Sequence, residues 1–239
     1  MITPPSARAV EGGFLKRERG LFMVKLSPSV LSADFARLGA DCREVLDAGA
    51  DMIHFDVMDG HFVDNLSFGL PVLEGLRRAL PQAYFDVHLM ITHPLTYVKE
   101  FVDAGANCIS FHVEASDNIR STIASIRAFG CEAGLVINPN TPAEAVFPYL
   151  DDLSLVLCMG VTPGHGGQAF RPETLEKLRK LKAECTRRGL NPYLSVDGGV
   201  KVETTAPQCV EAGANLLVAG SAIFGVQDKA EAVRRFKSL

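Results

Sequence analysis

Three short segments of the sequence resemble one another, and their spacing limits the folds open to the chain. They read AGADMIHFDV from Ala48, AGANCISFHV from Ala104 and AGANLLVAGS from Ala212. Each has a turn of small residues followed by an apolar run, which is how a helix ends and the next parallel strand begins. The offsets of 56 and 108 residues predict strand–helix units of about 27 residues, so the 239-residue chain has room for about eight of them.

Eight apolar runs at about this spacing are the expected strands. They are VKLSPSV from Val24, DMIHFDV from Asp51, AYFDVHLM from Ala83, NCISFHVE from Asn107, EAGLVIN from Glu132, LSLVLCM from Leu153, PYLSVDG from Pro192 and NLLVAGS from Asn215. Helical segments lie between them, such as 171–189, with Pro172 in its first turn and Gly189 as a stop signal. Regular alternation of this kind favours a closed barrel over a large open sheet. We expect a single α/β domain, a (β/α)8 TIM barrel that forms the catalytic domain over residues 23–239, after a flexible N-terminal tail at 1–22.

Composition excludes several classes of partner. With 47% hydrophobic residues, 22% charged residues and a net charge of −4, the chain has no sign of a nucleic-acid or membrane surface. The longest uncharged run, 153–170, is broken by Pro163 and several glycines, so it does not predict a membrane span. Six cysteines without a C-x-x-C pair are typical of reduced thiols in a cytoplasmic protein. We therefore expect a small-molecule substrate and a cytoplasmic location. A homo-oligomer is a separate expectation, on which composition has no bearing.

Strand parity selects the candidate site residues. In a parallel barrel, outward side chains pack under the helices, whereas inward side chains near the carboxyl ends of the strands face the site. Ile53, Phe55 and Val57 alternate with His54 and Asp56, so the polar residues are expected to point inward. The same parity turns further polar residues of two other strands inward: Asp86 and His88 on one, Ser195 and Asp197 on the other.

Four of these inward groups predict a metal site. They are His54, Asp56, His88 and Asp197. A mixed imidazole and carboxylate set suits one divalent ion of Zn, Fe(II), Mn or Co better than Ca or Mg, which prefer all-oxygen ligands. A single buried histidine is more often a hydrogen-bonded core residue than a ligand. Here, however, candidate ligands on three separate strands all point inward and lie near the carboxyl ends of their strands.

The two carboxylates also predict acid/base chemistry. Asp56 and Asp197 belong to strands that are not neighbours, so they would reach a substrate from opposite sides, one removing a proton and the other returning one. Such a proton must lie α to a carbonyl, and a metal would stabilise the resulting enediolate. No lysine is expected at the carboxyl end of a strand, which argues against a Schiff-base aldolase. Inward methionines at 58, 90 and 159 could cap the site or simply fill the core.

Glycine-rich turns predict a phosphate site. PGHGGQ from Pro163, DGGV from Asp197 and AGSAIF from Ala219 follow the sixth, seventh and eighth expected strands. Turns of this kind expose backbone N–H groups, and the loops after the last two strands of such barrels commonly hold a phosphate. The substrate is then expected to be a keto-sugar phosphate.

Together these motifs resemble the ribulose-phosphate 3-epimerase family, from about Lys25 to Phe224. The resemblance rests on SPS at Ser27, HFDVMDGHF at His54, VHLM at Val87, PG-x-GGQ at Pro163, VDGG at Val196 and GSAIF at Gly220. It implies an isomerase of carbohydrate metabolism that interconverts D-ribulose 5-phosphate and D-xylulose 5-phosphate in the pentose phosphate pathway.

The resemblance also implies residue roles. Asp56 and Asp197 would be the acid/base pair, and His54, Asp56, His88 and Asp197 would hold the metal. The implied substrate-binding residues are Ser29, Met58, His88, Met90, Met159, Gly164, His165, Gly166, Gly167, Gly198, Gly199, Gly220 and Ser221. His112 and Glu114, inward on the fourth strand, are candidates to support the metal site.

Position 165 departs from the family pattern, because His165 stands where PGFGGQ would have phenylalanine. A cationic imidazole there could bind the phosphate directly, although a plain loop substitution is the simpler interpretation. Two alternatives therefore stay open. One is an epimerase of a related substrate such as D-allulose 6-phosphate, and the other is a barrel that binds sugar phosphates without turning them over.

Overall fold

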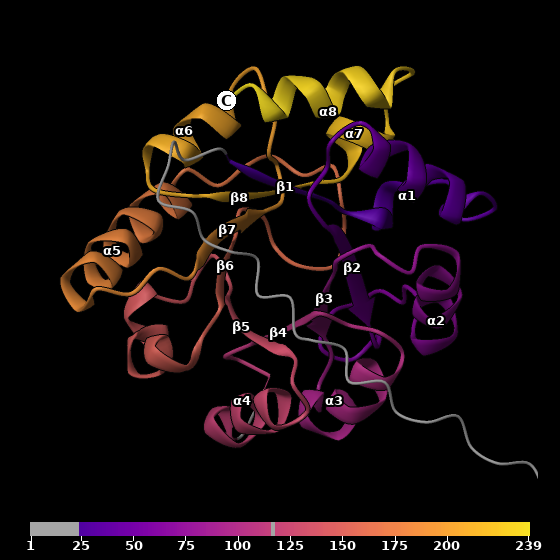
Figure 1. Cartoon of the computed structure of the whole chain (residues 1–239). Helices are drawn as coiled ribbons and strands as arrows, with labels where there is room; N and C mark the ends of the chain where they lie inside the picture. The colour runs from indigo at the N-terminus through magenta and orange to yellow at the C-terminus, as the bar shows by residue number, and fades with distance from the viewer. Residues whose placement is uncertain (1–23, 116–117) are drawn as a thin grey trace, which may run out of the picture.

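Eight parallel strands form the centre of the protein, and helices surround them (Figure 1). The computed structural model describes residues 24–115 and 118–239, so the tail expected at 1–22 lies outside the described residues. The strands are β1 (Lys25–Pro28), β2 (Ile53–Met58), β3 (Phe85–Met90), β4 (Cys108–His112), β5 (Glu132–Ile137), β6 (Leu155–Met159), β7 (Tyr193–Asp197) and β8 (Leu216–Ala219). Seven of them lie within the runs that the sequence predicts, and β2 extends one residue beyond its run, to Met58.

The sheet closes on itself between its first two strands. Hydrogen-bonded neighbours follow the order β1-β8-β7-β6-β5-β4-β3-β2. A parallel bridge between Ser29 and His54 joins the two remaining edges, and the amides of Asp51 and Met52 donate to the carbonyl of Leu26. Closure leaves no free strand edge, so the predicted TIM barrel is confirmed.

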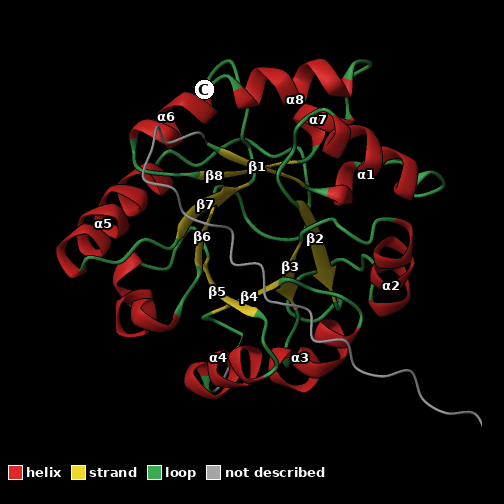
Figure 2. Ribbon diagram, in the orientation of Figure 1, coloured by secondary structure: helices red, strands yellow, loops and turns green. Residues whose placement is uncertain are grey.

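The outer layer consists of helices that follow the strands along the chain (Figure 2). The α-helices are α1 (Leu38–Asp47), α2 (Leu70–Ala79), α3 (Pro94–Asp103), α4 (Ile119–Ala128), α5 (Glu173–Arg188), α6 (Thr205–Glu211), α7 (Ser221–Phe224) and α8 (Lys229–Lys237). Two 3-10 helices, η1 (Val30–Ser32) and η2 (Ala143–Asp152), complete the set. As predicted, α5 ends at Gly189, whose φ of 69° is a left-handed conformation that favours glycine.

The connection between β5 and β6 differs from the other strand–helix units, because it is the 3-10 helix η2 and not an α-helix. Pro148 lies inside it, and a proline in a helix interior removes a backbone donor and clashes with the preceding turn. The segment still buries Val146 and Leu150 against the barrel.

The strands separate two apolar cores, as their parity predicts. Phe55, Phe85 and Phe111 point outward and pack under the helices. Leu157 and Val218 fill part of the barrel interior. Buried polar side chains also lie inside the barrel, and those that are 0% exposed include His54, Asp86, His88, Ser110, His112 and Ser195. This polar region points to the site.

All six cysteines are free and buried, as expected for core thiols. In the two described stretches of chain, no helix combines the length and the apolar character that a membrane crossing needs.

Candidate active site and metal centre

Three strands bring the four predicted metal ligands together. His54 and Asp56 come from β2, His88 from β3 and Asp197 from the last position of β7. One ligand atom from each of the four lies within 4.8 Å of the others. Both histidines are fully buried, and Asp56 is 2% exposed. The four side chains point into the barrel and lie at a similar level near the carboxyl ends of the strands, and they therefore form the compact group that the sequence predicts.

Asp86 orients His54. The Nδ1 atom of His54 lies 2.8 Å from Oδ2 of Asp86, while its Nε2 atom lies 3.2 Å from Oδ1 of Asp56. Burial alone would lower the pKa of His54, but the two carboxylates raise it well above its usual value. A carboxylate behind a histidine holds the ring with its other nitrogen toward the site. Sequence reasoning placed Asp86 inward but gave it no role.

The two candidate acid/base groups have environments that move their pKa values apart. Burial would raise the pKa of Asp56, but His54 and His88 lower it far below its usual range. Burial and the neighbouring charge of Asp56 raise the pKa of Asp197 to about 6. Ser29 adds a 2.5 Å hydrogen bond, in which its hydroxyl donates to Oδ2 of Asp56. One carboxyl is thus held ionised while the other binds a proton near neutrality.

The donor set fits a divalent transition metal. Two imidazole nitrogens and two carboxylate oxygens converge within a few ångströms, and such mixed ligands suit Zn, Fe(II), Mn or Co. His54 already has a carboxylate on its far side, and His88 has the His112 ring on its far side, at 2.9 Å between Nε2 atoms. Metal-binding histidines usually have such partners.

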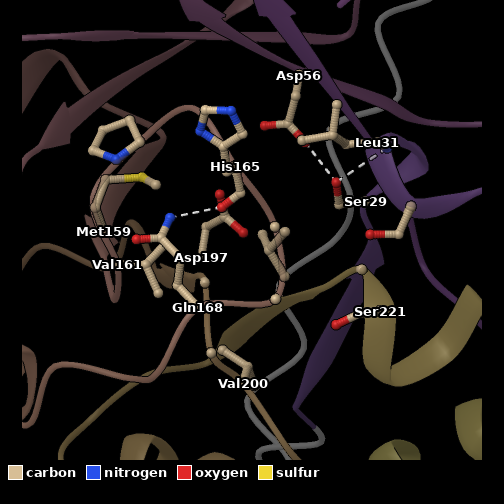
Figure 3. Close-up of a pocket in the computed structure, with 18 of the residues that line it drawn as sticks. Ser29, Leu31, Asp56, Met159, Val161, His165, Gln168, Asp197, Val200 and Ser221 are labelled. Atoms are coloured by element: carbon tan, nitrogen blue, oxygen red, sulfur yellow. Dashed lines mark hydrogen bonds between the residues drawn. The ribbon is translucent and has the colours of Figure 1, made fainter. Parts of the chain in front are cut away.

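A cavity of about 180 Å³ opens above this group at the carboxyl end of the barrel (Figure 3). It is lined by both aspartates and by most of the predicted substrate-binding residues, namely Ser29, Met58, Met90, Met159, Gly164, His165, Gly166, Gly167, Gly198, Gly199, Gly220 and Ser221. His54 and His88 are not among the lining residues, because they lie fully buried behind the carboxylates. Contact between His88 and substrate therefore stays a prediction.

The glycine turns at the rim of the cavity need glycine for two different reasons. Gly199 has a φ of 69°, and a Cβ on it would lie 2.7 Å from the Cα of Phe170. Gly220 has an ordinary φ, but a Cβ on it would lie 2.6 Å from Oγ of Ser32. In both turns the backbone itself forms the cavity wall, which suits the binding of a phosphate by main-chain N–H groups.

Sequence reasoning missed one cation and one loop contact at this cavity. Lys201 lines the cavity. It lies in the loop four residues after Asp197, the last residue of β7, and not at the end of a strand. Asn65, in the loop after β2, donates from Nδ2 to the carbonyl of Gly164 at 2.7 Å. The position of Lys201 after a glycine turn was the available signal for the cation. The contact between Asn65 and Gly164 joins residues 99 positions apart, and no local sequence pattern predicts it.

The fold and the paired carboxylates at the strand ends define the class, a TIM barrel with a candidate active site at its carboxyl edge. The model of the ribulose-phosphate 3 epimerase family matches residues 25–224. A ribulose-phosphate 3-epimerase of Synechocystis sp. is 49% identical over 212 residues, which are 88% of this chain and 91% of that protein. One of Bacillus subtilis is 46% identical over 216 residues, 90% of this chain and 99% of that protein.

Solved structures share the barrel at lower identity. The structure of KGPDC from Streptococcus mutans in complex with D-R5P has a TM-score of 0.70 at 17% identity, covering 90% of this chain and 96% of that chain. This likeness shows the fold alone. The family match and the curated relatives show more: the chain belongs to the ribulose-phosphate 3-epimerase family. It is an isomerase of the epimerase class that acts on carbohydrate.

Proposed function

We propose that this protein interconverts D-ribulose 5-phosphate and D-xylulose 5-phosphate by proton transfer at C3, with Asp56 and Asp197 as the two acid/base groups. The observation that carries the proposal is their convergence, with an oxygen of each within 4.8 Å of the other, combined with pKa shifts in opposite directions. Inversion of a carbon centre requires one group to take a proton while another delivers one to the opposite face. The names of the relatives supply the substrate.

The environments of the two carboxyls support a different starting state for each. Asp56 stays ionised beside His54 and His88 and takes the C3 proton. The pKa of Asp197, raised to about 6, makes it the readier of the two carboxyls to bind a proton, which it would deliver to the other face. The roles exchange in the reverse direction. The 2.5 Å bond from Ser29 to Oδ2 of Asp56 and the 3.2 Å contacts of Oδ1 with His54 and His88 fix the orientation of that carboxylate at the base of the cavity.

His54, Asp56, His88 and Asp197 would hold one divalent metal ion, of the group Zn, Fe(II), Mn or Co. When bound, the ion supplies electrophilic stabilisation for the negative charge that develops on the substrate oxygens. The far-side partners of the two histidines keep both rings in place for this role.

The glycine turns would bind the phosphate, and the methionines would cover the reacting carbon. Gly198, Gly199 and Gly220 line one part of the cavity. Met58, Met90 and Met159 line another and are at most 5% exposed. An apolar cover keeps water away from the carbanionic carbon and strengthens every electrostatic interaction beneath it.

A six-carbon substrate such as D-allulose 6-phosphate is the second candidate, because His165 lines the cavity where the family pattern has phenylalanine. The test is the ratio of kcat/KM for the pentose phosphate and the hexose phosphate on metal-loaded protein. Each tenfold in that ratio is about 1.4 kcal/mol of differential transition-state binding. A ratio of a hundred or more in favour of ribulose 5-phosphate supports the proposal, and a preference for the hexose overturns it.

A further inference from the structure

The rings of His88 and His112 meet inside the barrel, away from solvent. Their Nε2 atoms lie 2.9 Å apart, both side chains are fully buried, and the ring of Phe62 packs on His112 with centroids 4.7 Å apart. Two imidazole nitrogens at this distance form a hydrogen bond only when one of them carries a proton and the other does not. The direction of this bond therefore fixes where the remaining proton of each neutral ring sits.

Glu114 occupies the other side of His112. Its Oε2 atom lies 3.3 Å from Nδ1 of His112. Its Oε1 atom accepts hydrogen bonds from the amide of Asn138, at 2.9 Å, and from the hydroxyl of Thr141. A carboxylate with two donors on one oxygen remains an acceptor, and an ionised carboxylate can only accept. The proton of neutral His112 accordingly belongs on Nδ1, facing Glu114.

The position of the proton on His112 determines which nitrogen of His88 is free to bind a metal. With its proton on Nδ1, His112 presents a lone pair at Nε2, so Nε2 of His88 must donate. Nδ1 of His88 faces the cluster, with Oδ1 of Asp56 3.2 Å away. Because Nε2 keeps the ring's proton, the proton that Nδ1 shares with Asp56 in the metal-free protein can be given up to a metal ion, and neutral His88 then offers the Nδ1 lone pair as the ligand. The opposite arrangement would place a proton on Nδ1 of His88 and prevent it from binding a metal.

We propose that Glu114 and His112 are positioning residues that set the tautomer of His88, and thereby its ability to bind the metal. The inference rests on the proposed function only in assuming that His88 is a ligand. Neither residue lines the cavity. Loss of such partners typically weakens metal binding 10- to 100-fold.

The test is the affinity for Mn²⁺, measured from the electron paramagnetic resonance signal of the free ion, in the wild type and three variants. His112→Phe keeps a ring beside Phe62 but removes the acceptor, and its Kd should rise at least tenfold. His112→Gln offers a carbonyl oxygen to Nε2 of His88 and should stay within about threefold of the wild type. Ser110→Ala is the matched control, because Ser110 lies on the same strand and its hydroxyl donates to the carbonyl of Val87. This variant should bind like the wild type.

Spectroscopy of the Zn²⁺-loaded wild type provides the second measurement, which does not depend on a variant that folds. In ¹⁵N-histidine spectra, His88 should carry its proton on Nε2 and His112 on Nδ1. An Nε2 proton on His112, or wild-type affinity in a folded His112→Phe, would overturn the inference. Failure of the wild type itself to bind Mn²⁺ or Zn²⁺ would instead overturn the metal site in the proposed function.

Discussion

An oxygen of Asp56 and an oxygen of Asp197 lie within 4.8 Å of each other, although the two residues belong to β2 and β7, which have β1 and β8 between them in the barrel. Their pKa values move in opposite directions because only Asp56 contacts His54 and His88 directly, whereas burial and the charge of Asp56 act on Asp197. In the proposed mechanism these opposite shifts make one of two identical groups the base and the other the acid.

Replacement of the proposed acid should stop turnover and leave the barrel intact. We expect Asp197→Asn to lower kcat by about 10²- to 10⁴-fold, since an amide cannot deliver the proton. Ser195→Ala is the control: Ser195 also points into the barrel from β7, is buried and lies two residues away. Steady-state kinetics with circular dichroism as a fold check decides the matter, and full activity in Asp197→Asn would contradict the two-carboxylate mechanism.

The raised pKa of Asp197 predicts a pH-dependent stability of the metal-free protein. Between about pH 4 and pH 6 the unfolded chain releases this proton, since the ordinary pKa is 3.8, while the folded protein keeps it. The free energy of unfolding should therefore fall by up to about 3 kcal/mol as the pH rises through this window. Asp197→Asn has no proton to lose, so its stability relative to the wild type should grow by the same amount.

Urea unfolding of both proteins in the presence of a chelator, at intervals from pH 4 to pH 7, measures this difference. A difference that stays constant over the window would mean that Asp197 titrates normally in the folded protein.

Removal of metal should abolish epimerisation reversibly. After dialysis against a strong chelator, activity should be lost and should return with Mn²⁺ or Zn²⁺, more fully than with Mg²⁺ at the same concentration, because two of the four donors are imidazoles. Metal content is measured in parallel with activity. Undiminished turnover by protein with no detectable metal would refute the role of the ion.

The contact between Asn65 and Gly164 predicts that one loop holds another over the cavity. Asn65→Ala removes the 2.7 Å bond to the Gly164 carbonyl, and about 0.5 to 1.5 kcal/mol of restraint with it. We expect KM to rise up to about tenfold, and amide exchange at residues 164–168 to become faster. The neighbouring Leu66, 74% exposed, provides the control variant Leu66→Ala. Equal exchange in the two variants would show that the bond does not restrain the loop.

The sequence predicted the barrel and the candidate cluster because both depend on local periodicity. Alternation in the segment 53–58 placed Phe55 outward and Asp56 inward, and the same rule applied to β3 and β7. Once the strands are parallel and in a barrel, residues of equal parity and depth must converge. His88 and Asp197 therefore became neighbours of Asp56 in the prediction without any knowledge of distances.

Other features of the site could not be predicted, because they depend on rotamers and on contacts between loops. The direction of the Glu114 side chain toward His112 requires a particular side-chain conformation, and two-residue spacing on a strand does not specify it. The 3-10 helix η2 replaces an α-helix, which Pro148 could have signalled. The apolar pattern of the sequence did not indicate that the 3-10 helix η2 extends from Ala143 to Asp152.

If two different carboxyls act on the two faces of C3, epimerisation of ribulose 5-phosphate in D₂O will reveal it over the first turnovers. Each molecule of xylulose 5-phosphate should carry deuterium at C3, because the delivered proton comes from a group that has equilibrated with solvent. Product that retains the original protium would mean that a single group removes and returns the same proton. Tight binding without any exchange would mean that the protein binds the sugar phosphate but does not transform it.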